Sequence, residues 1–296
     1  MISKILFIFL SMVIFFIVKN QYKIFKKHRK FRKLYYILRK KYEKNGFLLF
    51  SYGSNFKLKF PIYFKKDEQM LFIIKFADFI LPVLPFEIFD KKEKQKIYEN
   101  FCREGSYFYG KVTVKPGDIV IDAGAHMGIF SAVASAFGGI VYAFEPIFET
   151  RKKYLSKIAE LNSKIYIIPL ALSNENGEFE IEIPDFGKSV GNLAGASIVK
   201  KFKNSKKEKI KTITLDKWVE ENKIEKVDFI KADIEGAERM MLEGAKNVLR
   251  EFAPKLSICI YHFPDDKEVI KDLILNANPK YKIVYGKAKL YAYVEK

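Results

Sequence analysis

One short stretch of the chain constrains its fold more than any other, because it joins an apolar run to two spaced glycines. Residues 119–123 are hydrophobic apart from one acid. Gly124 follows directly, and Gly128 comes four positions later. A continuous apolar run is typical of a parallel strand covered on both faces, and the glycines permit a tight turn into a helix. The next predicted strand, residues 140–144, ends at Glu145. The ends of such strands meet at one edge of a doubly wound sheet, so the pattern predicts a nucleoside-binding crevice there.

The spacing of this motif indicates which class of nucleoside the crevice accepts. A dinucleotide site needs Gly-x-Gly-x-x-Gly, in which the middle glycine lets the backbone approach a pyrophosphate. Here the middle position holds His126, and the pattern is Asp122-x-Gly124-x-x-x-Gly128. It resembles motif I of the class I methyltransferases, whose cofactor, S-adenosylmethionine, carries no phosphate. We expect the glycines to allow close approach, Glu145 to accept the ribose hydroxyls, and Asp122 to bind the ammonium group or orient the loop.

A second group of polar residues follows the predicted strand at 227–232. Lys231 and Asp233 point to the same side of an extended segment, and Glu235 begins the next helix. His262 follows the predicted strand at 256–260, so it should face the same crevice. We therefore predict that Asp233, His262, Glu235 and Lys231 are catalytic. Glu238 is more simply explained as an acid favoured by the helix dipole.

Several motifs of the chain together resemble the FkbM-type methyltransferases. They are Val114-Lys115-Pro116-Gly117-Asp118, the 122–128 loop, Phe144-Glu145-Pro146, Ala171-Leu172-Ser173 and the run from Asp228 to Glu238. The resemblance extends from about residue 109 to residue 294. It implies a class I fold, S-adenosylmethionine as cofactor, and O-methylation of a sugar or another secondary-metabolite hydroxyl. It adds Ala171 to the cofactor-binding candidates. It is broken at His126, where the family usually has Asn, but His126 remains a cofactor-binding candidate because it should still hydrogen-bond near the cofactor.

The remainder of residues 107–296 alternates between helical and strand patterns. This alternation predicts an α/β class I methyltransferase fold, a Rossmann-like doubly wound sheet that closes with an antiparallel hairpin of residues 281–285 and 289–294. We expect helices at 128–137, 147–161 and 268–275, and a single helical face from Ala237 to Leu249. The Gly-, Ser- and Lys-rich stretch 187–209 predicts a mobile loop.

The first 106 residues divide into three segments. Residues 5–18 are uninterruptedly apolar or small, and residues 2–18 reach the short limit for a membrane-spanning helix. Residues 19–46 form a basic juxtamembrane segment, which predicts a single-pass anchor with the catalytic domain in the cytoplasm. Residues 47–106 form a mixed cap segment, with strands or a hairpin between 47 and 64 and a helix at 91–101.

Composition limits the partners of the catalytic part. The first 44 residues carry a net charge of +12, out of +18 for the whole chain. The basicity therefore needs no nucleic-acid explanation in the catalytic part, although the basic tract suits lipid headgroups or RNA. Cys102 and Cys259 match neither a disulfide framework nor a zinc site.

We therefore predict a membrane-anchored, S-adenosylmethionine-dependent O-methyltransferase. Its acceptor would be a small molecule or a glycan, free or lipid-linked. RNA methylation through the basic tract and a non-catalytic cofactor-binding scaffold are the alternatives. Methyl transfer from a sulfonium needs no metal, although the carboxylates near Asp233 suit a hard divalent ion. The sequence leaves the oligomeric state and the exact acceptor open.

Overall fold

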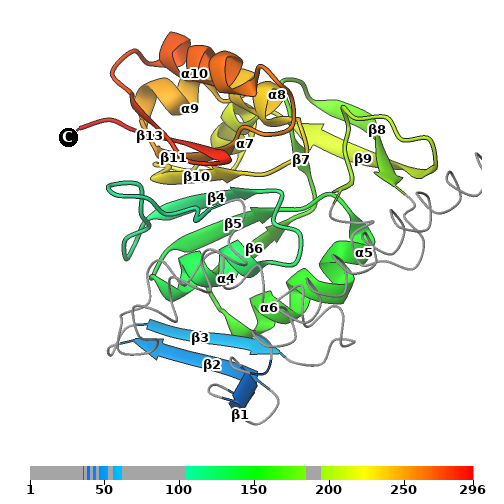
Figure 1. Ribbon diagram of the computed structural model, residues 1–296, viewed down its shortest axis with the longest axis vertical. Helices are drawn as coiled ribbons and strands as arrows, with labels where there is room; N and C mark the ends of the chain where they lie inside the picture. Colours follow the sequence, from blue (N-terminus) through cyan, green and yellow to red (C-terminus); the bar gives the residue numbers. More distant parts are fainter. Residues whose placement is uncertain are drawn as a thin grey trace, which may run out of the picture.

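The computed structural model describes residues 36, 39–40, 43–44, 47–52, 56–61, 105–184 and 195–295. Its centre is a seven-stranded sheet in the order β12-β13-β11-β10-β4-β5-β6 (Figure 1). Strands β11, β10, β4, β5 and β6 are parallel, and β13 is antiparallel to both β11 and β12. This confirms the predicted mostly parallel sheet and its terminal hairpin. The strands are β4 (Ile119–Ala123), β5 (Ile140–Phe144), β6 (Ile165–Ile168), β10 (Phe229–Ala232), β11 (Lys255–Cys259), β12 (Lys282–Tyr285) and β13 (Lys289–Tyr293).

Helices cover both faces of this sheet and divide its core in two (Figure 1). On one face lie α4 (Ile129–Ala136), α5 (Phe148–Thr150), the π-helical turn η1 (Arg151–Leu155) and α6 (Ser156–Leu161). On the other lie α7 (Leu215–Glu221), α8 (Glu238–Glu243), α9 (Lys246–Glu251) and α10 (Asp266–Ala277). Successive strand residues point to opposite faces, so Val120 packs in the first core and Ile121 in the second. The apolar run in the sequence is therefore buried on both sides.

A smaller sheet lies beside the ends of the central strands. It has the order β7-β9-β8, with β7 at Ala171–Leu172, β8 at Gly177–Pro184 and β9 at Ser205–Ile213. The predicted mobile loop 187–209 is therefore wrong over residues 205–209, which belong to β9. Cross-strand partners explain the difference, since Glu180 lies opposite Lys209 and Glu182 opposite Lys207. Opposite charges facing each other stabilise a strand pair.

Two predicted helices are interrupted. The helix expected at 147–161 contains the π-helical turn η1. The continuous helix expected from Ala237 to Leu249 is two helices, α8 and α9, which are separated at Gly244. A Cβ on Gly244 would lie 2.1 Å from the carbonyl oxygen of Ser173. This close contact with another segment fixes the chain at the point where the helix breaks.

The described part of the cap is a small antiparallel sheet. It consists of β1 (Glu43–Lys44), β2 (Phe47–Tyr52) and β3 (Phe56–Pro61), which confirms the hairpin expected between 47 and 64. The Leu58 and Phe60 side chains of β3 are buried in the core formed with α4 and α6. The predicted anchor 1–18 and the predicted helix 91–101 lie outside the described residues. Within the described ranges, no helix has the length and apolar character that crossing a bilayer requires.

Candidate active site

A pocket opens at the carboxyl ends of the central strands, between the large sheet and the small one. It contains about 600 Å³ of atom-free space, its solvent-open mouth included. One part of its wall is polar and the other is apolar. The polar part includes Gly124, His126, Glu145, Asp233 and Glu235, and the apolar part includes Leu170, Ala171, Ile181, Ile198, Ile210 and Ile234.

Glu145 is the buried acid at the cofactor end of this pocket. One carboxylate oxygen accepts the backbone N–H of His126 and the other accepts that of Ile147, both at 2.9 Å. Burial raises the pKa of Glu145 to about 7, against the effect of these two hydrogen bonds. A carboxylate offers about four lone-pair sites, so two remain for hydroxyl donors. The group therefore suits the vicinal hydroxyls of a ribose, and the apolar wall suits a flat base.

The backbone conformation and the packing of the fold require glycine at both motif positions. Gly124 and Gly128 have φ angles of 75° and 80°, which favour glycine over residues with a side chain. A Cβ on Gly124 would lie 2.2 Å from the carbonyl oxygen of Asp233, and one on Gly128 would lie 2.7 Å from Leu155 Cδ1. Gly124 lines the pocket, whereas Gly128 packs against α6 and η1. The turn thus joins the cofactor end to the segment that carries Asp233.

Lys231 and Asp122 lie beneath this turn instead of in the pocket wall. The Lys231 ammonium donates to the carbonyl oxygens of Gly124 at 2.7 Å and Ala123 at 3.0 Å, and it pairs with Asp122 at 3.0 Å. Both side chains are buried. The contacts favour the loop-orienting alternative for Asp122, and they place Lys231 as a brace of the loop. Lys231 does not line the pocket, but its charge acts on Asp233 and Glu145 from beneath the turn.

Asp233 is a second acid in the pocket wall, on the segment that packs against Gly124. Its two carboxylate oxygens accept the phenolic hydroxyls of Tyr107 and, at 3.1 Å, of Tyr261. Glu235 lines the pocket beside it and pairs with Lys200 at 2.9 Å. Tyr107 was not predicted from the sequence, because it lies 126 residues from Asp233 and outside any motif.

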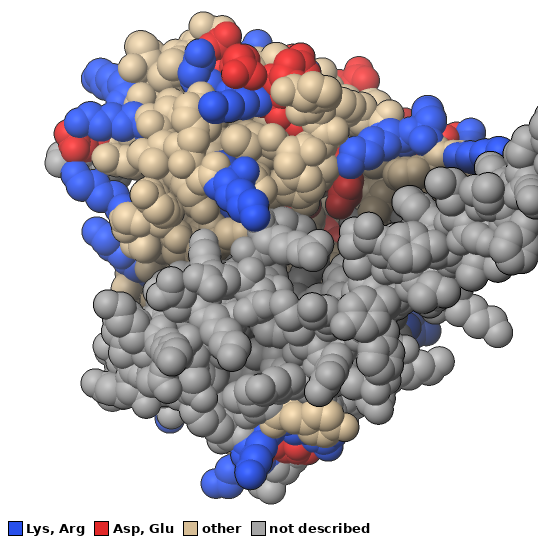
Figure 2. Space-filling view, viewed as in Figure 1, with Lys and Arg blue, Asp and Glu red and all other residues tan. Residues whose placement is uncertain are grey.

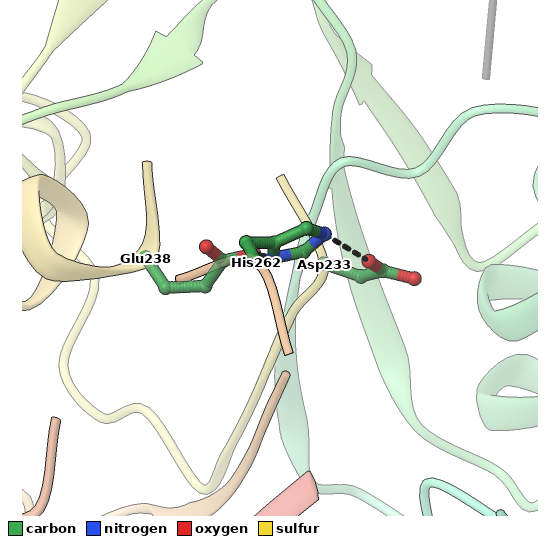
Figure 3. Close-up of side chains that lie close together, drawn as sticks. All are labelled: Asp233, Glu238 and His262. Carbon is green, nitrogen blue, oxygen red and sulfur yellow. Dashed lines mark ion pairs between the residues drawn. The ribbon is translucent and has the colours of Figure 1, made fainter. Parts of the chain in front are cut away.

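His262 lies between carboxylates on both sides of its ring (Figure 3). Nδ1 is 3.2 Å from Glu238 Oε1, while Nε2 is 3.5 Å from Glu235 Oε2 and 3.9 Å from Asp233 Oδ1. Its side chain is 1% exposed, and it lies behind the pocket acids instead of lining the pocket itself. Burial lowers the pKa of His262, but the close contact with Glu238 and the charges of Asp233 and Glu235 outweigh it and raise the pKa overall.

Glu238 lies in the first turn of α8, where an acid was expected, and it makes two kinds of contact that were not expected. Its carboxylate accepts the backbone N–H groups of Ile234 and Gly236, at 2.8 and 3.0 Å. The same group faces His262 Nδ1. An acid at the start of a helix is favoured by the dipole alone, so the sequence contains no signal for the contact with a histidine 24 positions away.

The same cluster is the candidate metal site within the described residues. Single ligand atoms of Asp233, Glu238 and His262 lie within 4.8 Å of one another. However, Glu238 faces Nδ1 and Asp233 faces Nε2, on opposite edges of the ring. An imidazole binds a metal through one ring nitrogen, so this arrangement does not present three ligands to one ion. We assign no metal site to it.

Comparison with known families decides the class of protein to which this fold belongs. Residues 122–281 match the model of the methyltransferase FkbM domain. The chain belongs to the FkbM methyltransferase family. Membership confirms the resemblance seen in the sequence, the enzyme class, a methyltransferase, and the cofactor, S-adenosylmethionine. The Glu145 carboxylate and the apolar wall fit the ribose and the adenine of this cofactor.

Solved structures of other proteins align with part of the chain. An FkbM methyltransferase from Methylobacillus flagellatus KT has 18% sequence identity and a TM-score of 0.48, with 76% of this chain and 59% of that chain covered. The fibrillarin of Aeropyrum pernix with bound S-adenosyl-L-methionine has 13% identity and a TM-score of 0.38, covering 61% and 67%. A putative methyltransferase from Streptococcus mutans in complex with SAH has 14% identity and a TM-score of 0.34, covering 60% and 88%.

The present chain thus spans about 59% of the length of the Methylobacillus protein. No curated protein is significantly similar to the chain in sequence.

Proposed function

We propose that the protein methylates a hydroxyl group of a neutral, polyhydroxylated acceptor such as a sugar, a glycan or a related secondary metabolite, free or lipid-linked. The observation that carries this proposal is the presence of Asp233 and Glu235 in the wall of the same pocket as Glu145. Glu145 would hold the ribose of S-adenosylmethionine, and the His126 loop would lie beside it. The bound cofactor supplies an electrophilic methyl group.

Asp233 is the group best placed to receive the proton of the acceptor. A hydroxyl is a weak nucleophile, so its proton must leave as the methyl group is transferred. The phenols of Tyr107 and Tyr261 hold the Asp233 carboxylate in one orientation, and lone pairs remain for the acceptor hydroxyl. A fixed carboxylate aligns that hydroxyl for attack, which supplies a further part of the rate.

The charge of the pocket favours a neutral acceptor over RNA. The carboxylates of Asp233 and Glu235 lie in the pocket wall, where they repel a phosphate near the reacting hydroxyl. Lys200 offsets only one of them. On the face shown in Figure 2, the Lys and Arg side chains of the described residues occupy several separate places instead of one continuous patch. Sugar hydroxyls, by contrast, donate hydrogen bonds to carboxylates.

Labelled methyl transfer into fractionated cell extract tests this proposal. Full-length protein would be incubated with tritium-labelled S-adenosylmethionine and separate glycan, lipid, small-molecule and RNA pools. We expect label in a pool that contains sugar hydroxyls, and far slower labelling with an Asp233→Asn variant. Label in RNA alone would overturn the acceptor class, and an absence of label in every pool would overturn the proposed activity.

We further propose that residues 2–18 anchor the protein in a membrane with its catalytic domain in the cytoplasm. The support is the apolar run followed at once by the basic tract from Lys19 to Lys44, since positive residues prefer the cytoplasmic side. Deleting residues 1–18 should release the protein from washed membranes. Release of the full-length chain by the same wash, or cleavage of its carboxyl terminus by external protease in intact cells, would contradict the proposal.

A further inference from the structure

Three carboxylates surround one buried imidazole behind the pocket. Glu238 lies on the Nδ1 side of His262, and Glu235 and Asp233 lie on the Nε2 side (Figure 3). A neutral imidazole has only one N–H donor, whereas the imidazolium has two. Acidic neighbours on both sides of the ring therefore match the doubly protonated form.

The charge balance of the cluster points to the same form. Asp233, Glu235 and Glu238 bring three negative charges, and the Lys200 ammonium lies 2.9 Å from Glu235. Lys231 is engaged by Asp122 beneath the turn. Buried charges are costly unless they are paired. With Lys200 counted, the three acids leave two excess negative charges. An imidazolium at His262 reduces this excess to one, whereas a neutral ring leaves both.

Every element packed around His262 holds it in this position. Besides the three acids, the ring of Tyr261 lies against it, with a centroid distance of 4.2 Å. From α10, the Asp266 carboxylate accepts the backbone N–H of His262 at 2.9 Å, and Arg239 of α8 pairs with Asp266 at 2.8 Å. The ring is thus fixed from both ends of the chain segment that carries it.

We propose that His262 is a positioning residue. As an imidazolium it lies between Glu238 on one side and Asp233 and Glu235 on the other, and it keeps the two pocket acids ionised and in the positions that proton transfer needs. Glu238 acts through His262, because it fixes the ring and its charge. The kinetic consequence of this proposal rests on the proposed methyl transfer, while the charge state of His262 does not.

In the reaction, His262 keeps both of its protons. The acceptor O–H bond breaks as the new O–CH₃ bond forms, and the proton goes to Asp233. The electron pair of the broken C–S bond stays on the sulfur of the methyl donor. Charge is balanced, because one positive sulfonium and one carboxylate give a neutral thioether and a neutral acid. The imidazolium is needed before the step, when Asp233 and Glu235 are both negative.

Nuclear magnetic resonance of full-length protein tests the charge state without any acceptor. The chain contains three histidines, so the imidazole nitrogen spectrum is simple, and a His262→Gln variant identifies the His262 signals. We expect both nitrogens of His262 to carry protons at neutral pH, with a titration midpoint above the value of about 6.5 for an unperturbed histidine. Glu238→Gln should lower this midpoint, while Glu251→Gln on the exposed side of α9 should not.

A midpoint at or below that of an unperturbed histidine, or an unprotonated Nε2 at neutral pH, would overturn the proposal. So would selective broadening of the His262 signals by micromolar Mn²⁺, because that result would show a metal site instead. Each of these outcomes is independent of methyl transfer.

The pH dependence of kcat separates a positioning role from a role as base. With the acceptor pool found above, kcat should fall as the pH rises through the His262 midpoint, and this limb should move to lower pH in Glu238→Gln. His262→Gln should lower kcat by about 100-fold, the effect of a small misplacement of reacting groups, with the cofactor Kd unchanged. A kcat that instead rises through the midpoint would make His262 the base and would disprove the positioning role. If no pool accepts label, the proposed function fails, while the magnetic resonance result still decides the state of His262.

Discussion

The pocket holds its acids in two different ways. Glu145, which we place at the cofactor end, is buried and accepts two backbone N–H donors, and burial raises its pKa to about 7 against those bonds and the charges of Arg151 and Lys231. At the acceptor end, the carboxylates of Asp233 and Glu235 have phenols, an ammonium and an imidazole close by. Partial protonation reduces the cost of the charge at Glu145, whereas nearby donors and cations reduce it at Asp233 and Glu235.

This difference corresponds to what each end has to do. A group that only receives ribose hydroxyls keeps the same proton count through the reaction. A group that takes a proton must be ionised beforehand and must stay aligned as its charge changes. The comparison therefore predicts that charge matters most at Asp233, and that the hydrogen-bond acceptor matters most at Glu145.

The largest effect should come from removing the charge at Asp233. Asp233→Asn keeps the size of the side chain and one of the two oxygens that accept the tyrosine hydroxyls. It replaces the other oxygen by an amide NH₂ and removes the proton acceptor. The methyl-transfer rate should fall by about 10² to 10⁴, the usual contribution of a general base. Calorimetry should show an unchanged affinity for the cofactor. A near wild-type rate in a folded variant would place the chemistry elsewhere.

A smaller effect is expected at the other end. Glu145→Ala removes the acceptor of the ribose hydroxyls and should weaken S-adenosylmethionine binding by about 1 to 3 kcal/mol, the range for a lost hydrogen bond to a charged group. Titration calorimetry of the full-length protein measures this directly, with the exposed Glu149→Ala as control. Equal affinities would remove Glu145 from the cofactor site, and tighter binding of NAD than of S-adenosylmethionine would contradict the cofactor.

The smallest effect is a pH dependence of the same binding step. Because the pKa of Glu145 in the free protein is about 7, the carboxylate that accepts hydroxyls is present above this pH and is lost below it. Cofactor affinity should therefore fall about tenfold from pH 8 to pH 6, and Glu145→Gln should abolish this dependence. A pH-independent affinity in the wild-type protein would show that Glu145 does not meet the ribose as an ionised group.

The cofactor end was largely predictable from the sequence because its parts are contiguous or lie at successive strand ends. The run 119–128 specifies a strand, a turn and a helix start, and Glu145 ends the neighbouring strand β5. Periodicity likewise indicated the strands and the terminal hairpin. These features depend on local backbone preference and on the alternation of apolar residues, which a sequence shows directly.

The arrangement of the acceptor end was not predictable in the same way. The contacts of Glu238 with His262 and of Tyr107 with Asp233 join distant positions, and each residue has an ordinary local explanation of its own. The strand pattern predicts to which side of the strand Lys231 points. It does not predict that the Lys231 ammonium binds the carbonyl oxygens of Gly124 and Ala123, because that contact depends on how the glycine turn packs. Long-range pairing of this kind follows from tertiary packing, not from the pattern along the chain.

The glycine turn has a consequence for how this fold changes over evolutionary time. Gly124 is fixed by the carbonyl oxygen of Asp233, and Gly128 by Leu155, so both are needed by a chain that merely folds. A descendant that had lost catalysis would therefore keep its Gly-x-x-x-Gly signature under selection for stability alone. Glu145 and Asp233 would be freed first, since holding an acid away from water has a cost. The carboxylates, not the glycines, are the residues by which working and retired copies of this fold would be told apart.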